Sequence, residues 1–159
     1  REPGIVWVEH TFFGRQLSDM TGTSYYQRGG LDQRDRRIEL EKGDQAVIAS
    51  IASNSEGRNL QMFNRNLVVS CPPNGTQLEQ LLGRTHRDGQ KAEAVTFEIV
   101  TTCLEHVTAF HQSMKDCHYV RDTQGVPQKV LVADVEFMSL DSLLDRTELP
   151  RWSKTNDEE

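Results

Sequence analysis

Short runs rich in Ile, Val and aromatic residues alternate along this chain with segments of helical pattern. The run "GIVWVEH" (4–10) is apolar and too short for a helix, so it predicts a buried strand. The same patterns predict further strands at 24–27, 46–51, 66–71, 94–102 and 129–137, and helices at 11–22, 31–42, 74–87 and 103–121. Such alternation is typical of an α/β fold with a mainly parallel sheet. We therefore expect the working residues on loops beyond the carboxyl ends of the strands.

Composition narrows the class of protein further. The chain has 159 residues, enough for one domain of ordinary size, and is 36% hydrophobic and 26% charged. Its net charge of -6 argues mildly against tight, nonspecific nucleic-acid binding by this segment alone. No apolar run approaches the roughly 20 residues of a membrane span, and three cysteines without a disulfide pattern suggest a reducing cytosol. Residue 1 is Arg rather than Met, which leaves open where the natural chain starts.

The predicted helix 11–22 is expected to pack one apolar face against the protein, whereas the predicted helix 31–42 is expected to lie in solvent. Thr11 is the expected N-cap of helix 11–22, and Gly22 is its stop. Four of its residues are spaced for one apolar face: Phe12, Phe13, Leu17 and Met20. The segment 31–42 instead alternates basic and acidic residues, which favours a solvated helix with i,i+4 ion pairs over a track for a phosphate backbone.

The stretch "QLLGRTHRDGQ" (80–90) concentrates positive charge beside a glycine in an acidic chain. In a helix, residues three apart share a face, so Arg84 and Arg87 are expected to point the same way, with Gln80 one turn earlier. Gly83 leaves room for a ligand or another backbone at that face. Two forked guanidiniums suit a polyphosphate, whereas the alternative is a pair of surface arginines bound to nearby acids, Glu79 or Asp88.

Two spaced motifs, Gly-x-Asn-Leu in the loop after one predicted strand and Gln-x-x-x-Arg-x-His-Arg-x-Gly-Gln in the helix after the next, resemble one family pattern. The matching residues are Gly57, Asn59 and Leu60, then Gln80, Arg84, His86, Arg87, Gly89 and Gln90. The pattern is similar to the C-terminal RecA-like lobe of superfamily 2 helicases and translocases, Snf-type, in a bacterial or phage form. The resemblance implies a three-layer α/β/α sandwich over 1–137, best matched over 4–102. We expect 138–159 to be an extension with a disordered tail.

In this family ATP binds between two lobes, and the second lobe supplies arginines to the γ-phosphate. By resemblance, Arg87 is the arginine finger and Arg84 its catalytic partner at the phosphates. Gln80 is expected to orient the arginines or to link them to the nucleic-acid side. Gly57 and Asn59 are expected at the nucleotide edge of the lobe. The implied cofactor is ATP with Mg²⁺, the metal being held mainly by the missing N-terminal lobe.

The resemblance also implies a nucleic-acid edge, on DNA or RNA. Small neutral donors suffice to contact a phosphate backbone. The residues placed there are His10, Ser50, Ser53 and Ser55. The sequence departs from the family pattern at three positions: Ile51 stands where Thr is usual, and Glu56 and Arg58 replace apolar residues of the Gly-rich loop.

No phosphate-loop motif and no acidic helicase motif occur in the chain. We therefore expect it to be inactive alone, and to act with an N-terminal helicase lobe in cis or in trans, in the cytoplasm of a bacterial or phage-infected cell and away from membranes. One alternative is a stand-alone, non-catalytic lobe that binds nucleic acid or a partner motor. Another is an unrelated α/β protein in which the two motifs arose by coincidence.

A cluster of Cys and His residues in the predicted helix 103–121 invites a zinc-site interpretation. Its members are Cys103, His106, His111, Cys117 and His118. Helical spacing instead predicts an apolar stripe of Val107, Phe110, Met114 and Cys117 that also takes in Cys103. The paired Cys-x-x-Cys of a structural zinc site is missing, and nothing positions a third group for a Cys-His nucleophile. The sequence therefore predicts no metal site here.

Overall fold

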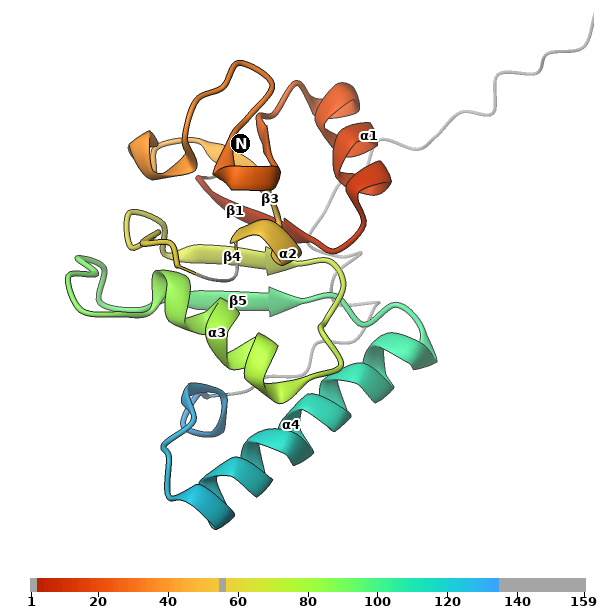
Figure 1. The fold of residues 1–159 in the computed structure, drawn as a ribbon, viewed down its shortest axis with the longest axis vertical. Helices are drawn as coiled ribbons and strands as arrows, with labels where there is room; N and C mark the ends of the chain where they lie inside the picture. The colour runs from red at the N-terminus through yellow and green to blue at the C-terminus, as the bar shows by residue number, and fades with distance from the viewer. Residues whose placement is uncertain (1–2, 55–56, 135–159) are drawn as a thin grey trace, which may run out of the picture.

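The computed structural model describes residues 3–54 and 57–134, and its centre is a five-stranded sheet. The strands are β1 (Gly4–Val8), β2 (Tyr25–Tyr26), β3 (Ala46–Ser50), β4 (Arg65–Val68) and β5 (Thr96–Ile99). They lie in the order β2-β3-β1-β4-β5, and every neighbouring pair is parallel (Figure 1). The α/β class with a parallel sheet, which the sequence predicted, is therefore confirmed.

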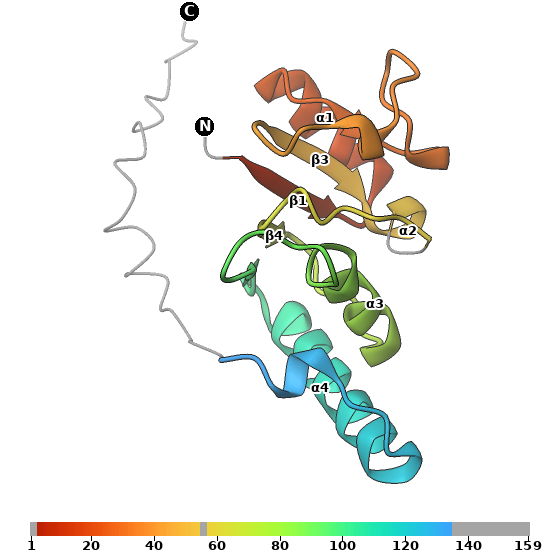
Figure 2. The same cartoon turned by 90° about the vertical axis from the view of Figure 1, so that its left-hand side faces the viewer.

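Helices cover both faces of the sheet, which gives three layers (Figures 1 and 2). They are α1 (Thr11–Thr21), α2 (Ile51–Asn54), α3 (Gly75–Thr85) and α4 (Leu104–Gln124). Successive residues of a strand point to opposite faces. Accordingly Leu17 of α1 packs beside Val8 on one face, whereas Leu81 of α3 packs with Ile5 and Trp7 on the other. Helix α4 packs along α3.

A buried polar chain fixes the end of α3 to the two central strands. Trp7 is fully buried, and its indole N–H donates to Asn66 Oδ1 at 3.0 Å. The amide of Asn66 in turn donates to Thr85 Oγ1, at the last residue of α3, at 3.1 Å. Because buried polar groups need partners, these bonds specify where α3 ends against β4. That endpoint positions the arginine-bearing turn described below.

The buried face of α1 differs from the one predicted. Phe12 and Met20 are 79% and 74% exposed, whereas Gly14 and Ser18 are buried. At Gly14 a Cβ would lie 2.5 Å from Cζ of Tyr25, so only glycine lets that ring pack against the helix. The predicted apolar face is therefore confirmed at Leu17 and wrong at Phe12, Phe13 and Met20, since close approach of β2 selects small residues instead. The N-cap is His10 rather than Thr11.

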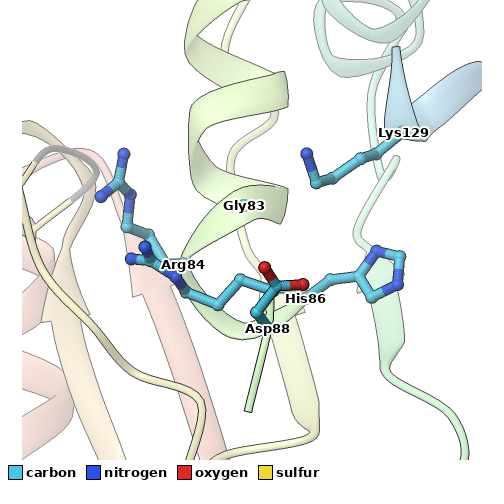
Figure 3. Close-up of a pocket in the computed structure, with 6 residues that line it drawn as sticks. Gly83, Arg84, His86, Asp88 and Lys129 are labelled. Atoms are coloured by element: carbon cyan, nitrogen blue, oxygen red, sulfur yellow. The ribbon is translucent and has the colours of Figure 1, made fainter. Parts of the chain in front are cut away.

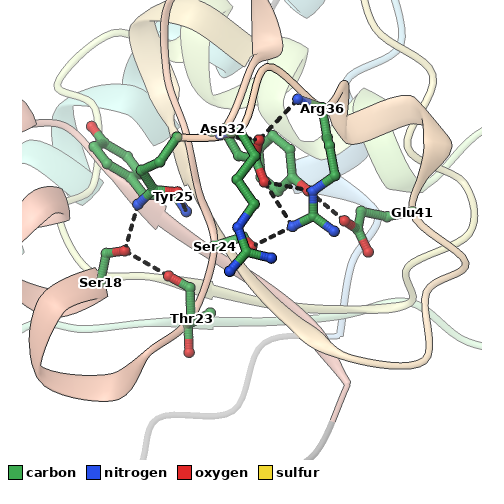
Figure 4. Close-up of polar contacts among 10 residues, drawn as sticks. Ser18, Thr23, Ser24, Tyr25, Asp32, Arg36 and Glu41 are labelled. Atoms are coloured by element: carbon green, nitrogen blue, oxygen red, sulfur yellow. Dashed lines mark hydrogen bonds and ion pairs between the residues drawn. The ribbon is translucent and has the colours of Figure 1, made fainter.

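The charged segment 31–42 is not a helix. Asp32 Oδ1 accepts from the backbone N–H groups of Arg34 at 2.8 Å and Arg36 at 2.9 Å, and Oδ2 accepts from the Arg36 guanidinium at 2.7 Å (Figure 4). Such bonds offer the backbone an alternative to helix. Burial opposes ionisation, but the hydrogen bonds together lower the pKa of Asp32. One i,i+4 ion pair therefore forms without the helix, which is reduced to a 3₁₀ turn, η2 (Ile38–Leu40), anchored by the buried Ile38.

The long C-terminal helix predicted from the sequence is confirmed, but its two ends and the segment after it differ from the prediction. Helix α4 is a residue shorter at its start and extends to Gln124, with Gly125 as its left-handed cap. Lys129–Leu131 form a 3₁₀ turn, η3, where a strand at 129–137 was predicted; residues 135–137 lie outside the described part, as does the extension 138–159. None of the described helices combines the length and apolar character that crossing a bilayer requires.

Two of the three cysteines, Cys71 and Cys117, are buried in one apolar cluster, and the third is exposed. Cys117 packs with Phe110 and Met114 between α3 and α4, as the predicted stripe requires. Cys103 is exposed as the N-cap of α4, so its assignment to that stripe is wrong. Burial, with a smaller contribution from the charge of Glu9, raises the pKa of Cys71 to about 12. Among the described residues, no three His, Cys, Asp or Glu side chains are arranged to hold a metal ion.

Candidate functional site

The two motifs singled out in the sequence meet at one edge of the lobe. The backbone N–H of Leu60 donates to the carbonyl oxygen of Arg84 at 3.0 Å, and Arg84 Nη1 donates to the carbonyl oxygen of Arg58 at 3.1 Å. The loop that carries Gly57 and Asn59 is thereby joined to the end of α3. Because α3 runs antiparallel to the strands, this junction lies beyond the amino end of β4 rather than the carboxyl end (Figure 1). The expectation that all working residues follow strand ends is wrong for the arginines.

Arg84 is held by carbonyl oxygens within this junction. Its Nε donates to the carbonyl oxygen of Gln80, one turn earlier, at 3.1 Å, while Nη1 reaches Arg58. The side chain is half-buried, so its rotamers are restricted before any ligand arrives. Hydrogen bonds to neutral acceptors orient a guanidinium without cancelling its charge. Gln80 thus touches Arg84 through its backbone, and its own side chain is half-buried.

Arg87 lies outside the helix in which it was predicted. Helix α3 ends at Thr85, and His86 is its C-cap, so the argument that Arg84 and Arg87 share a helix face is wrong. Gln90 explains the ending, because its amide donates to the carbonyl oxygens of Thr85 at 3.1 Å and Phe63 at 2.9 Å and folds the chain into a turn. Arg87 is exposed there, and its side chain makes no hydrogen bond or ion pair within the described residues.

Both arginines nevertheless border the same hollow of about 400 Å³. Figure 3 shows Gly83 on the helix, with Arg84 to one side and Lys129 to the other. The lining residues are Gly83, Arg84, His86, Arg87, Asp88 and Lys129. A Cβ added to Gly83 would have nothing within 4 Å, so the space above this residue is open. Arg84, Arg87 and Lys129 thus line the hollow with one acidic residue, Asp88, and forked guanidiniums of this kind suit a multivalent anion.

Neither Glu79 nor Asp88, the two acids considered as partners of the arginines, pairs with Arg87 within the described residues. Glu79 pairs with Lys129, at 3.5 Å between Oε1 and Nζ, and its carboxylate also accepts the backbone N–H of Lys129 at 2.8 Å. These bonds pin η3 against α3 and bring Lys129 to the hollow. Asp88 is exposed and forms no ion pair with Arg87 within the described part of the chain.

The remaining nucleotide-edge residues lie in the loop itself. Gly57 is exposed and has a φ of +67°, a left-handed conformation that favours glycine. Asn59 is exposed two residues later. Their side of the loop is therefore accessible, and their roles at a nucleotide stay predictions.

The predicted nucleic-acid residues gather at the opposite edge, where β1 and β3 end. His10 is exposed after β1, and Ser53 is half-buried in α2 after β3. Ser50 is only 4% exposed at the end of β3. Ser55 lies outside the described residues. The structure thus separates the candidates into two edges, joined by the loop that runs from α2 toward β4 (Figure 2).

Sequence reasoning missed two basic residues near these edges. Lys129 belongs to a segment that the family resemblance does not cover, so no motif pointed to it. Arg58 forms an ion pair with Glu39, and its side chain is 16% exposed. Its signal was present in the sequence: a charged residue at a loop position where the family pattern is apolar.

Comparison with known proteins finds similar sequences in bacteria. The RNA polymerase-associated protein RapA of Actinobacillus pleuropneumoniae serotype 5b (strain L20) is 29% identical over 110 residues, which are 63% of this chain and 11% of that protein. An uncharacterised ATP-dependent helicase of Bacillus subtilis (strain 168), YqhH, is 33% identical over 84 residues, 50% of this chain and 15% of that protein. No protein-family profile matches the chain.

A solved structure shows the same fold. The crystal structure of the C-terminal part of the Fun30 ATPase domain superposes with a TM-score of 0.54 at 19% identity, covering 70% of this chain and 39% of that one. At this identity the similarity concerns the fold alone, and it confirms the RecA-like α/β architecture. The chain spans only 11% and 15% of the length of the two sequence relatives above.

Proposed function

We propose that this helicase-like C-terminal lobe of superfamily 2 is the second motor lobe of an ATP-dependent DNA helicase or translocase of the Snf type. In this role it contributes Arg87 as arginine finger and Arg84 as the neighbouring phosphate ligand. The other half of the ATP site lies on an N-terminal lobe, in cis or in trans. RNA is the second possible track.

The observation that carries this proposal is the hollow at the end of α3. Arg84 is oriented by two carbonyl oxygens, and Arg87 stands exposed on the following turn, so one arginine is preorganised and the other is able to reach outward. Charge that develops on a transferred phosphoryl group is stabilised by such cations, which contribute about 10³ to 10⁵ in rate. The open space above Gly83 admits the phosphates or the facing lobe.

ATP with Mg²⁺ fits the donors of this lobe only in part. Arg84 and Arg87 would bind phosphate oxygens, and Gly57 and Asn59 would border the nucleotide. The chain has no phosphate-loop motif and no acidic motif for the metal, which would be held mainly by the other lobe. We therefore infer that the chain alone does not hydrolyse ATP.

The opposite edge supports a contact with the phosphate backbone of a nucleic acid. His10 is exposed after β1 and Ser53 is half-buried after β3, and both offer small donors that read no sequence. With a net charge of -6, the lobe would hold its track by a few local contacts rather than by a general positive field. We place this work in the cytoplasm of a bacterial or phage-infected cell.

The test is Arg87→Ala in a protein that joins this lobe to its phosphate-loop lobe. Nucleic-acid-stimulated ATP hydrolysis should fall by about 10³-fold or more, because the developing charge loses its cation. Nucleotide binding, followed with a fluorescent ATP analogue, should persist, and Arg87→Lys should recover only part of the rate. Undiminished turnover in the Ala variant would sink the assignment.

A further inference from the structure

The side chain of Arg58 connects three segments that are far apart in the sequence. Its guanidinium forms an ion pair with Glu39 of η2, and its Nε donates to the carbonyl oxygen of Ser53 in α2 at 3.4 Å. It also lies flat against the backbone of Gly30, where an added Cβ would be 2.3 Å from Cζ of Arg58. With 16% of its side chain exposed, Arg58 is held from several sides.

The backbone of the same residue serves Arg84. The Arg58 carbonyl oxygen accepts from Nη1 of Arg84 at 3.1 Å, and two residues later Leu60 N–H donates to the Arg84 carbonyl oxygen at 3.0 Å. A carbonyl orients a guanidinium only if the carbonyl itself is fixed. Gly57, the residue before Arg58, is exposed and left-handed, and the Arg58 side chain attaches the loop to Glu39 and to the carbonyl oxygen of Ser53.

We propose that Arg58 is a positioning residue for Arg84: the Glu39–Arg58 ion pair fixes the loop, and the loop fixes the guanidinium that meets the polyphosphate of a nucleotide. The role of Arg84 at phosphate rests on the function proposed above, whereas the link from Glu39 to Arg84 rests on contacts within the lobe. Arg58 also reaches Ser53, so it stands between the two edges of the lobe. The family pattern has an apolar residue here, which makes this link a property of this chain.

The surroundings of Glu39 explain why the ion pair is needed. Its Oε2 is buried and has no hydrogen-bond partner among the described residues. Removal of Arg58 alone would leave this half-buried carboxylate, which is 32% exposed, without its cation, and so would disturb the loop for a second reason. The informative variant therefore changes both partners, Arg58→Met with Glu39→Gln, which removes the link without leaving an unpaired charge.

The link itself is tested on the 159-residue chain by the NMR signal of the Arg84 Nε–Hε group, assigned through its disappearance in Arg84→Lys. The double variant should shift and broaden this signal, because Nη1 loses a fixed acceptor. The matched control is Arg37→Met, which removes one positive charge from the exposed surface of the same segment as Glu39 and should leave the signal in place. An unchanged Arg84 signal in a folded double variant overturns the proposal.

The consequence for ligand binding is tested by titrating the chain with inorganic tripolyphosphate at low salt. The double variant should bind about fivefold more weakly, and adding Arg84→Ala should cause little further loss, because residues acting through one contact are not additive. Fully additive losses would overturn the positioning role. If the wild-type chain does not bind tripolyphosphate while the Arg84 signal still responds to Arg58, the phosphate function fails and the link within the lobe stands.

Discussion

Residues 31–42 and 80–90 are both arginine-rich, yet they use arginine in opposite ways. In the first segment, Arg36 donates through Nε and Nη2 to Asp32 Oδ2, at 2.9 and 2.7 Å, and so neutralises a buried carboxylate. In the second, the hydrogen bonds of Arg84 to Gln80 and Arg58 end on carbonyl oxygens, and Arg87 stands exposed. The first segment uses the positive charge of Arg36 to hold a loop, whereas the second presents Arg87 on an exposed turn.

The kind of acceptor that holds a guanidinium helps to separate structural from functional arginines. A carboxylate partner fixes a guanidinium and also cancels its field, which leaves little attraction for a further anion. A carbonyl partner fixes the guanidinium and leaves its net charge intact. Sequence composition does not distinguish the two cases, because both segments contain acids within four residues of their arginines. Whether an arginine in such a segment is neutralised depends on which acceptor the fold places beside its guanidinium.

The largest expected effect contrasts Arg84→Ala with Arg36→Ala in the complete two-lobe protein. Arg84→Ala should lower ATP turnover by about 10² to 10³, the range found when one preorganised donor is removed from a developing charge. Arg36→Ala should lower the thermal midpoint, because Asp32 loses its ion-pair partner, and should leave turnover nearly unchanged. Steady-state ATPase assays and thermal denaturation measure both. Comparable turnover losses in the two variants would remove the distinction between the segments.

A smaller effect is expected from Asp32→Asn, measured as the free energy of unfolding in urea. At pH 7 the variant should be about 1 to 3 kcal/mol less stable, since charge-assisted hydrogen bonds become neutral ones. The folded pKa of Asp32 is lowered, so its stabilisation is present above the ordinary value of 3.8 and is lost as the pH falls through the folded pKa. The difference between wild type and variant should therefore shrink on acidification below about pH 4. A constant difference down to pH 2 would contradict it.

The two segments also show which features of the fold and of the candidate site could be predicted from the sequence. The strand alternation predicted the parallel sheet, and the family resemblance implied that Gly57 and Asn59 belong to the same nucleotide site as Arg84 and Arg87. The loop at 31–42 escaped prediction because side-chain bonds from Asp32 compete with the helix its charge pattern suggests. The sequence pattern placed Arg87 on a helix because local periodicity does not contain the tertiary contact that helps to end α3. In that contact the amide of Gln90 donates to the carbonyl oxygen of Phe63.

The smallest expected effect concerns two glycines, one beside each segment or within it, that differ in the space around their Cα atoms. At Gly43, which follows the first segment, φ is +76° and a Cβ would lie 2.1 Å from the carbonyl oxygen of Met62, so glycine is required by packing. Gly83, within α3, has nothing within 4 Å of the same point. Gly83→Ala should therefore raise stability by about 0.5 to 1 kcal/mol, the usual gain for removing glycine from a helix interior.

Because the lobe alone is expected to gain stability from a side chain at residue 83, we infer that the open space serves something outside the lobe. Gly83→Met should fold as well as Gly83→Ala and fill the hollow, so its affinity for tripolyphosphate should fall about threefold or more while the Ala variant changes little. Urea denaturation and the titration are compared on the same samples, with Gly43→Ala as the variant that must lose stability. If Gly83→Met binds tripolyphosphate as wild type does, the hollow admits the facing lobe rather than the anion, and the phosphate contacts of this region reduce to Arg84 and Arg87.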